Sequence, residues 1–157
     1  VDVLGALLRA GAAVNQATGD RGYTLLIRAT EADRRDAADV LIAHGAAVDQ
    51  ASIDGSTPLM FAVAQGHSVV DVLVAHGAAV DQAMVGGWTS LLIAAQNGLV
   101  DVVDLLIASG ANVNKAGPDG ATPLFFASRE GHAGVVDLLI AAGANVDDAA
   151  VDEATPL

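Results

Sequence analysis

The chain has no cysteine, a single lysine (Lys115) and very few aromatic residues. The absence of cysteine excludes disulfides, thiol catalysis and cysteine-based zinc sites. A reducing cytoplasm fits this composition and is the expected location, although missing cysteine does not establish a compartment. Hydrophobic residues make up 53% of the chain, yet its apolar stretches fall well short of the roughly 20 residues that span a membrane.

Basic residues are scarce as well: seven stand against 19 acidic ones, for a net charge of −12. This charge repels phosphate backbones and anionic lipid headgroups, so we expect neither nucleic acid nor a membrane as the partner. Four of the seven basic residues lie close together in sequence: Arg21, Arg28, Arg34 and Arg35. They form either a positive patch for an acidic partner segment or, as we favour, local pairs with neighbouring acidic residues.

The motifs of common catalytic and nucleotide-binding sites are missing too. The chain contains no G-x-S-x-G, no phosphate loop, no G-x-G-x-x-G and no H-E-x-x-H. Asp101 and Asp104 share a helix face, but similar aspartates recur along the chain, which indicates a solvated face and not an acid–base pair. His44 and His76 lie at predicted helix ends, where the dipole favours a cation without any metal. We predict no enzyme, no metal and no cofactor.

What the chain does contain is a repeat with a period of about 33 residues. The phrase Gly-Ala-x-Val-Asp/Asn recurs at almost constant intervals, and a phrase with Thr, then Pro, Ser or Leu, then Leu keeps step with it. The first phrase begins at Gly11, Gly45, Gly77, Gly110 and Gly143, and the second at Thr24, Thr57, Thr89, Thr122 and Thr155. Such a period indicates a stack of one supersecondary unit, and function is then expected on a surface spread over several units.

The local sequence of each unit predicts two short helices. Thr57 offers a side-chain oxygen to a helix start, and Pro58 suits the first helical position. The second helix carries apolar pairs at helical spacing and ends at a glycine such as Gly77, where a left-handed cap is expected. An Asp-Gly turn at Asp54-Gly55 then reverses the chain. Units this small cannot bury their apolar faces alone, so stacking stabilises them.

At these residues the sequence resembles the ankyrin repeat family. The best match runs through Asp119-Gly120-Ala121-Thr122-Pro123-Leu124, Gly131-His132 and Gly143-Ala144-Asn145-Val146. The resemblance implies structural roles for His67 and His132, each of which follows the glycine between the two helices of its unit. The histidine that the family has after Thr-Pro-Leu is absent, so apolar packing is expected in its place; the replacing residues are Ile27, Met60, Leu92 and Phe125.

The expected fold is an all-α repeat solenoid of stacked helix–turn–helix units with β-turn tips. We predict one domain over 1–157, with four full units at 19–51, 52–83, 84–116 and 117–149 (units 2 to 5) and partial units at 1–18 and 150–157. Unit 2 has an extra tip residue, and unit 3 lacks one residue after Gly66-His67. The partial units suggest a fragment of a longer array, whose uncapped ends could associate end to end.

In the ankyrin family, partners usually bind the turn tips and the exposed side of the first helices, which line a concave groove. Carried onto this chain, the resemblance implies a partner-binding surface that contains Arg21, Tyr23, Ile53, Ser56, Gln65, Val85, Trp88, Gln96, Asn97, Arg129 and Glu130. Trp88 is the favoured contact because tryptophan is frequent among interface hot spots; the alternative is that it folds over the next unit. Arg28 is expected to be partly buried, and Phe125 and Phe126 are expected in the core.

The predicted function is therefore a non-catalytic protein–protein interaction module that holds a protein partner on its concave surface. The alternative is a structural spacer within a longer array, with no dedicated partner of its own. Truncating the tip aromatic residues would abolish a contact in the first case and change only stability or solubility in the second.

Overall fold

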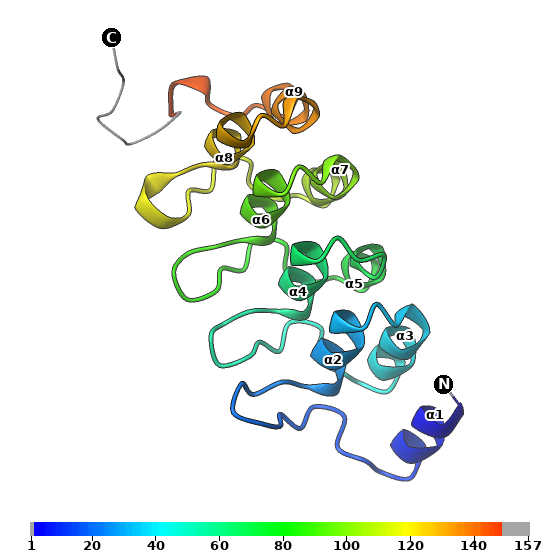
Figure 1. Ribbon diagram of the computed structural model, residues 1–157. Coiled ribbons are helices and arrows are strands. Elements are labelled where there is room, and N and C mark those ends of the chain that lie inside the picture. Colours follow the sequence, from blue (N-terminus) through cyan, green and yellow to red (C-terminus); the bar gives the residue numbers. More distant parts are fainter. Residues whose placement is uncertain (1, 149–157) are drawn as a thin grey trace.

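The computed structural model describes residues 2–148 as two parallel rows of short helices (Figure 1). The first row contains α2 (Leu25–Glu31), α4 (Pro58–Ala64), α6 (Ser90–Gln96) and α8 (Pro123–Glu130). The second row contains α1 (Asp2–Arg9), α3 (Arg35–Ala43), α5 (Val70–Ala75), α7 (Val100–Ala108) and α9 (Ala133–Ala141). The 3-10 turns η1 (Pro118–Gly120) and η2 (Val146–Asp148) complete the elements. Across the described residues the fold is helical, with only isolated bridges Thr18–Tyr23 and Ala83–Thr89 at two tips, which confirms the predicted fold class.

Figure 1 shows how the chain passes from one unit to the next through long loops, the tips, that project from the side of the first row. First helices pack on first helices and second helices on second helices, so the apolar core is continuous along the stack. Fully buried leucines such as Leu59, Leu73, Leu91 and Leu106 belong to this one cluster. No unit has a core of its own, which is why stacking stabilises the fold.

Threonine side chains cap the starts of the first helices, as predicted. Thr24, Thr57, Thr89 and Thr122 each accept a hydrogen bond from the backbone N–H three residues later, at 3.2–3.3 Å. The amides of the first turn have no acceptor within the helix, and the cap satisfies one of them in each of these helices.

We expect Thr57→Ala to lower the free energy of unfolding by about 1 kcal/mol, since the buried amide of Met60 loses its acceptor. Urea denaturation measures this change. Thr57→Ser keeps the oxygen and is expected to retain most of the stability. Equal stability of the alanine and serine variants would contradict a role for the cap.

The glycines that end the second helices have left-handed backbones, with φ between 81° and 90° at Gly45, Gly77, Gly110 and Gly143, as predicted. The Asp or Asn that closes each phrase has a role that sequence reasoning did not assign. Its side-chain oxygen accepts the backbone N–H of the next unit at 2.8–3.0 Å: Asn15 from Ala47, Asp49 from Ala79, Asp81 from Asn112, and Asn114 from Asn145. The repeated phrase therefore carries a ladder of bonds between units.

The predicted irregularity after Gly66-His67 is visible as a shortened helix. α5 has six residues, whereas α3, α7 and α9 have nine each. The partial unit predicted at 150–157, with its phrase at Thr155, lies outside the described residues.

Candidate functional site

The tips of units 2, 3 and 4 are joined edge to edge by backbone hydrogen bonds. The amide of Ile53 donates to the carbonyl of Arg21 at 3.0 Å, and the amide of Val85 donates to the carbonyl of Asp54 at 2.9 Å. Pro118 occupies the corresponding position in unit 5 and has no N–H to donate. The backbones of the first three tips are thus held in fixed register, and the side chains on them are positioned together.

Ile53 and Val85 project from these joined tips into solvent, with 74% and 72% of their surfaces exposed. A shallow cavity of about 230 Å³ lies beside Ile53, lined by Asp20, Arg21, Tyr23, Ile53 and Asp54. The predicted exposure of both apolar side chains is confirmed.

The predicted exposure of Tyr23 is wrong, because its side chain is buried at 5% exposure. Its ring packs edge-on against Phe61 of the next unit, with centroids 5.1 Å apart. Trp88 repeats this arrangement: its ring lies 4.8 Å from that of Phe126 in the next unit, and the residue is half-buried. The aromatic residue before a capping threonine therefore packs on a phenylalanine of the following first helix. Trp88 combines this packing role with a partly exposed surface.

Ser56 is also buried, which corrects its predicted place on the surface. Its hydroxyl donates to Met84 Sδ of the next tip at 3.6 Å, and its amide donates to the carboxylate of Asp54 at 3.1 Å. A hydrogen bond from the Ser52 hydroxyl lowers the pKa of Asp54, and this effect outweighs desolvation, which raises it. Serine at this position closes the Asp-Gly turn instead of facing a partner.

Arg28 is exposed. Partial burial was predicted because the equivalent positions of the other units carry Phe61, Ile93 and Phe126. Its guanidinium lies over the Tyr23 ring, 4.6 Å from the centroid, and donates to Glu31 at 3.0 Å. Arg21 approaches the same ring from the tip and donates to the Tyr23 hydroxyl at 3.4 Å. The i,i+3 spacing of Arg28 and Glu31 was the sequence signal for this pair.

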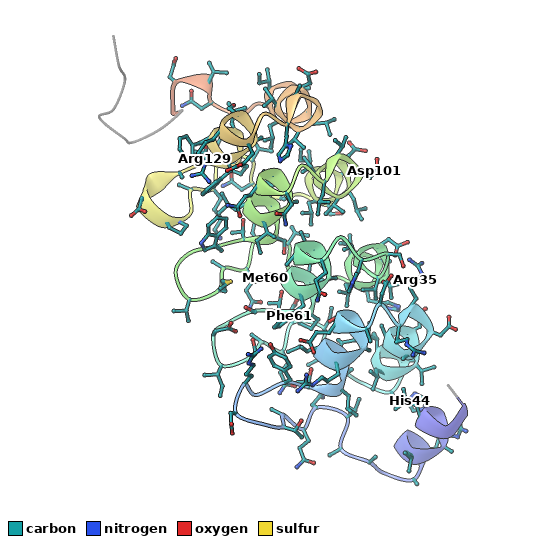
Figure 2. The ribbon with its side chains drawn as sticks, viewed as in Figure 1. Arg35, His44, Met60, Phe61, Asp101 and Arg129 are labelled. Carbon is teal, nitrogen blue, oxygen red and sulfur yellow. The ribbon has the colours of Figure 1, made fainter. Side chains whose placement is uncertain are left out.

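A similar group lies at the other end of the first row, where Figure 2 labels Arg129 on α8. Its guanidinium is 5.6 Å from the Phe125 ring and 5.2 Å from the Phe126 ring, and it donates to Glu130 at 2.8–2.9 Å. Phe126 is buried and Phe125 half-buried, close to the prediction that both lie in the core. Cations stacked on rings in this way are held in place while their outer N–H groups face solvent.

The remaining predicted surface residues lie at the C-terminal ends of the first helices. Gln65, Asn97, Arg129 and Glu130 are exposed, and Gln96 is half-buried. Together with Arg21, Ile53, Val85 and Trp88, these are the residues that we call the concave surface below. It contains mixed apolar, aromatic and charged groups.

All four histidines make hydrogen bonds within the protein. His67 and His132 each donate from a ring nitrogen to a backbone carbonyl of the preceding unit, that of Thr30 at 2.8 Å and that of Gln96 at 2.9 Å. His44 donates to the carbonyl of Val40, and His76 lies 3.3 Å from the Asp39 carboxylate. Among the described residues, no group of three or more His, Cys, Asp or Glu side chains could hold a metal.

The four arginines of unit 2 do not form one patch. Arg21 and Arg28 lie on the tip side, whereas Arg35 bonds with Asp71 of the next unit in the second row. Local pairing is confirmed for Arg28 and Glu31 but is wrong for Arg35, whose partner is 36 residues away in sequence.

Comparison with known families supports the architecture seen here. The model for ankyrin repeats (3 copies) matches residues 1–84 and 79–150. No curated protein sequence matches the chain. No described helix is long and apolar enough to cross a membrane. Ankyrin repeat proteins are generally protein–protein interaction modules and typically not enzymes. With a match that covers nearly its whole length, this chain belongs to the ankyrin repeat family.

Proposed function

We propose that this domain binds a protein partner on its concave surface. The observation that carries the proposal is the exposure of Ile53 and Val85 at corresponding positions of neighbouring tips. Single exposed apolar residues are common on any protein. Ile53 and Val85 lie on adjacent tips whose backbones are hydrogen-bonded together, so they form an apolar ridge of fixed position. Exposing this ridge to water is unfavourable, and a partner that covers it gains the corresponding free energy.

Preorganised side chains on both sides of this ridge support the proposal. Trp88 is held against Phe126, and Arg28 and Arg129 lie over aromatic rings. Side chains that are already fixed lose little conformational entropy when a partner binds, so more of their contact energy appears as affinity. Tryptophan and arginine are also the residue types most frequent among interface hot spots.

We expect Ile53→Asp/Val85→Asp to weaken partner binding by about 100-fold, because two hot-spot contacts are lost and two carboxylates are placed in the interface. The fold should be retained, since both side chains are largely solvated. The matched control is Val100→Asp/Ile140→Asp, which changes two exposed apolar residues in the second row.

The measurement is affinity capture from a lysate of the source organism, followed by titration of each captured protein against all three forms. A partner lost by the tip variant and kept by the control supports the proposal. Equal capture by both variants, or no capture by the wild type, would instead favour a spacer segment of a longer array. End-to-end self-association stays a prediction, and light scattering of the same samples measures it.

A further inference from the structure

The junction between units 2 and 3 is unlike the others on its second-helix side. At corresponding positions between the two helices, units 3, 4 and 5 have Gly66, Gly98 and Gly131, each with a positive φ. Unit 2 has Asp33 there, with a φ of 48°, which residues other than glycine rarely adopt. The second helix of the following unit, α5, is also the shortened one. An unfavourable backbone and a truncated helix therefore meet at one junction.

Asp33 takes part in capping this truncated helix from the neighbouring unit. Its carboxylate accepts the backbone N–H of Val69 at 3.1 Å and the hydroxyl of Ser68 at 3.2 Å. Val69 itself, the residue before α5, has no oxygen in its side chain to cap the helix. The capping oxygen thus comes from 36 residues earlier in the chain.

Arg35 adds a second polar link across the same junction. One guanidinium nitrogen donates to the carbonyl of Ser68 and to the Asp71 carboxylate, and the other donates to Asp71 at 3.1 Å. Figure 2 labels Arg35 where α3 and α5 face each other. Both partners of this ion pair are exposed, so it is accessible to salt.

We propose that this junction is a polar joint of the solenoid, where the second-helix row opens first when Asp33 and Asp71 are neutralised or screened. Both sides of the junction bury apolar side chains: Leu26 and Leu59 on the first-helix side, where Tyr23 also packs on Phe61, and Leu41 and Leu73 on the second-helix side. The charged links between the two units lie on the second-helix side. Opening would therefore occur on one side only and would change the angle between units 2 and 3.

The direction of the acid response follows from the two carboxyl groups. Desolvation raises the pKa of Asp33, but hydrogen bonds from Ser68 and Val69 outweigh it and lower the pKa below its ordinary value. The hydrogen bond from Arg35 lowers the pKa of Asp71 in the same way. A lowered folded-state pKa means that the stabilisation is present above the ordinary carboxyl pKa of about 3.9 and is lost as the pH falls through the lowered values.

Other charged groups surround the joint. α3 contributes Asp39, the segment before α5 contributes His67, the segment after it contributes His76, and α7 on its far side carries Asp101 and Asp104. His76 lies beside Asp39, and Asp101 and Asp104 are exposed. The acidic groups add repulsion that opposes closure of the joint, which makes the contribution of Arg35 more important.

Hydrogen exchange followed by mass spectrometry at pH 7 tests the joint, with Asp33→Gly as the main variant. If only backbone strain counted, glycine at φ 48° would protect α5 as well as or better than the wild type. We expect the opposite: α5 amides exchange about fivefold faster because the cap is lost, while α7 and α9 keep their rates. Asp33→Asn keeps an oxygen acceptor and is expected to lie between the two. In the wild type, 1 M salt should also accelerate α5 selectively.

Two outcomes would overturn the proposal. One is unchanged or slower exchange of α5 in Asp33→Gly. The other is a uniform acceleration in all helices, which would mean general destabilisation without a joint. Further measurements at decreasing pH should show the difference between the wild type and Asp33→Gly shrinking as the pH falls through the lowered pKa of Asp33, since protonation weakens Asp33 as an acceptor.

Discussion

Replacing Tyr23 with alanine is expected to lower the free energy of unfolding by about 3 kcal/mol, the magnitude typical of removing a buried aromatic side chain. The ring is 5% exposed and packs against Phe61 of the next unit, with Arg28 over one face. Its removal leaves a cavity between units 2 and 3 and also removes the surface on which Arg28 lies. Urea denaturation of the two proteins measures the change.

Tyr23→Phe is the matched control. It keeps the ring contacts and loses the hydroxyl, whose hydrogen bond from Arg21 is long at 3.4 Å, so the expected loss is below about 1 kcal/mol. An alanine variant as stable as the phenylalanine variant would show that the ring contributes no packing. The expected result has a consequence for binding studies: a partner lost on truncating Tyr23 would reflect a damaged junction, whereas one lost on changing Ile53 would reflect a lost contact.

The parts of the fold that follow local rules could be predicted from the sequence. A threonine before an apolar run caps a helix wherever it occurs, and Thr24, Thr57, Thr89 and Thr122 do so here. A glycine after such a run ends the helix in a left-handed conformation, as at Gly77. These interactions involve residues three or four apart, so a single unit contains all the information. The repeat period then predicted that the units stack on one another.

The parts that could not be predicted depend on side chains of the next unit. Tyr23 is buried because Phe61 lies 38 residues further on, at the position where its own unit has Arg28. The cap that Asp33 provides to α5 could not be predicted for the same reason, because its partner lies in the next unit. This is also true of the hydrogen-bond ladder between units formed by Asn15, Asp49, Asp81 and Asn114. Family resemblance gave the positions of the tips but not which tip side chains turn inward. Of the two tip aromatic residues, Tyr23 is buried and only Trp88 keeps a partly exposed surface.

Gly98→Ala is expected to cost about 3 kcal/mol for two separable reasons. The first is backbone conformation, since φ is 69° at Gly98 and a β-carbon is unfavourable there by about 1 kcal/mol or more. The second is a collision: the added methyl carbon would lie 2.6–2.8 Å from three atoms of the His132 ring. The ring must then move, which breaks its 2.9 Å hydrogen bond to the carbonyl of Gln96 and loosens the contact between units 4 and 5.

Gly131→Ala separates the two reasons, because Gly131 has a similar φ of 78° but no atom within 4 Å of the added carbon. It is expected to cost only the conformational part, about 1 kcal/mol. A second separation comes from the His132→Ala background, in which Gly98→Ala should fall to the same value as Gly131→Ala. Urea denaturation of the four variants completes this cycle. Equal costs for Gly98→Ala and Gly131→Ala in the wild-type background would show that moving the His132 ring away from Gly98 costs no free energy of unfolding.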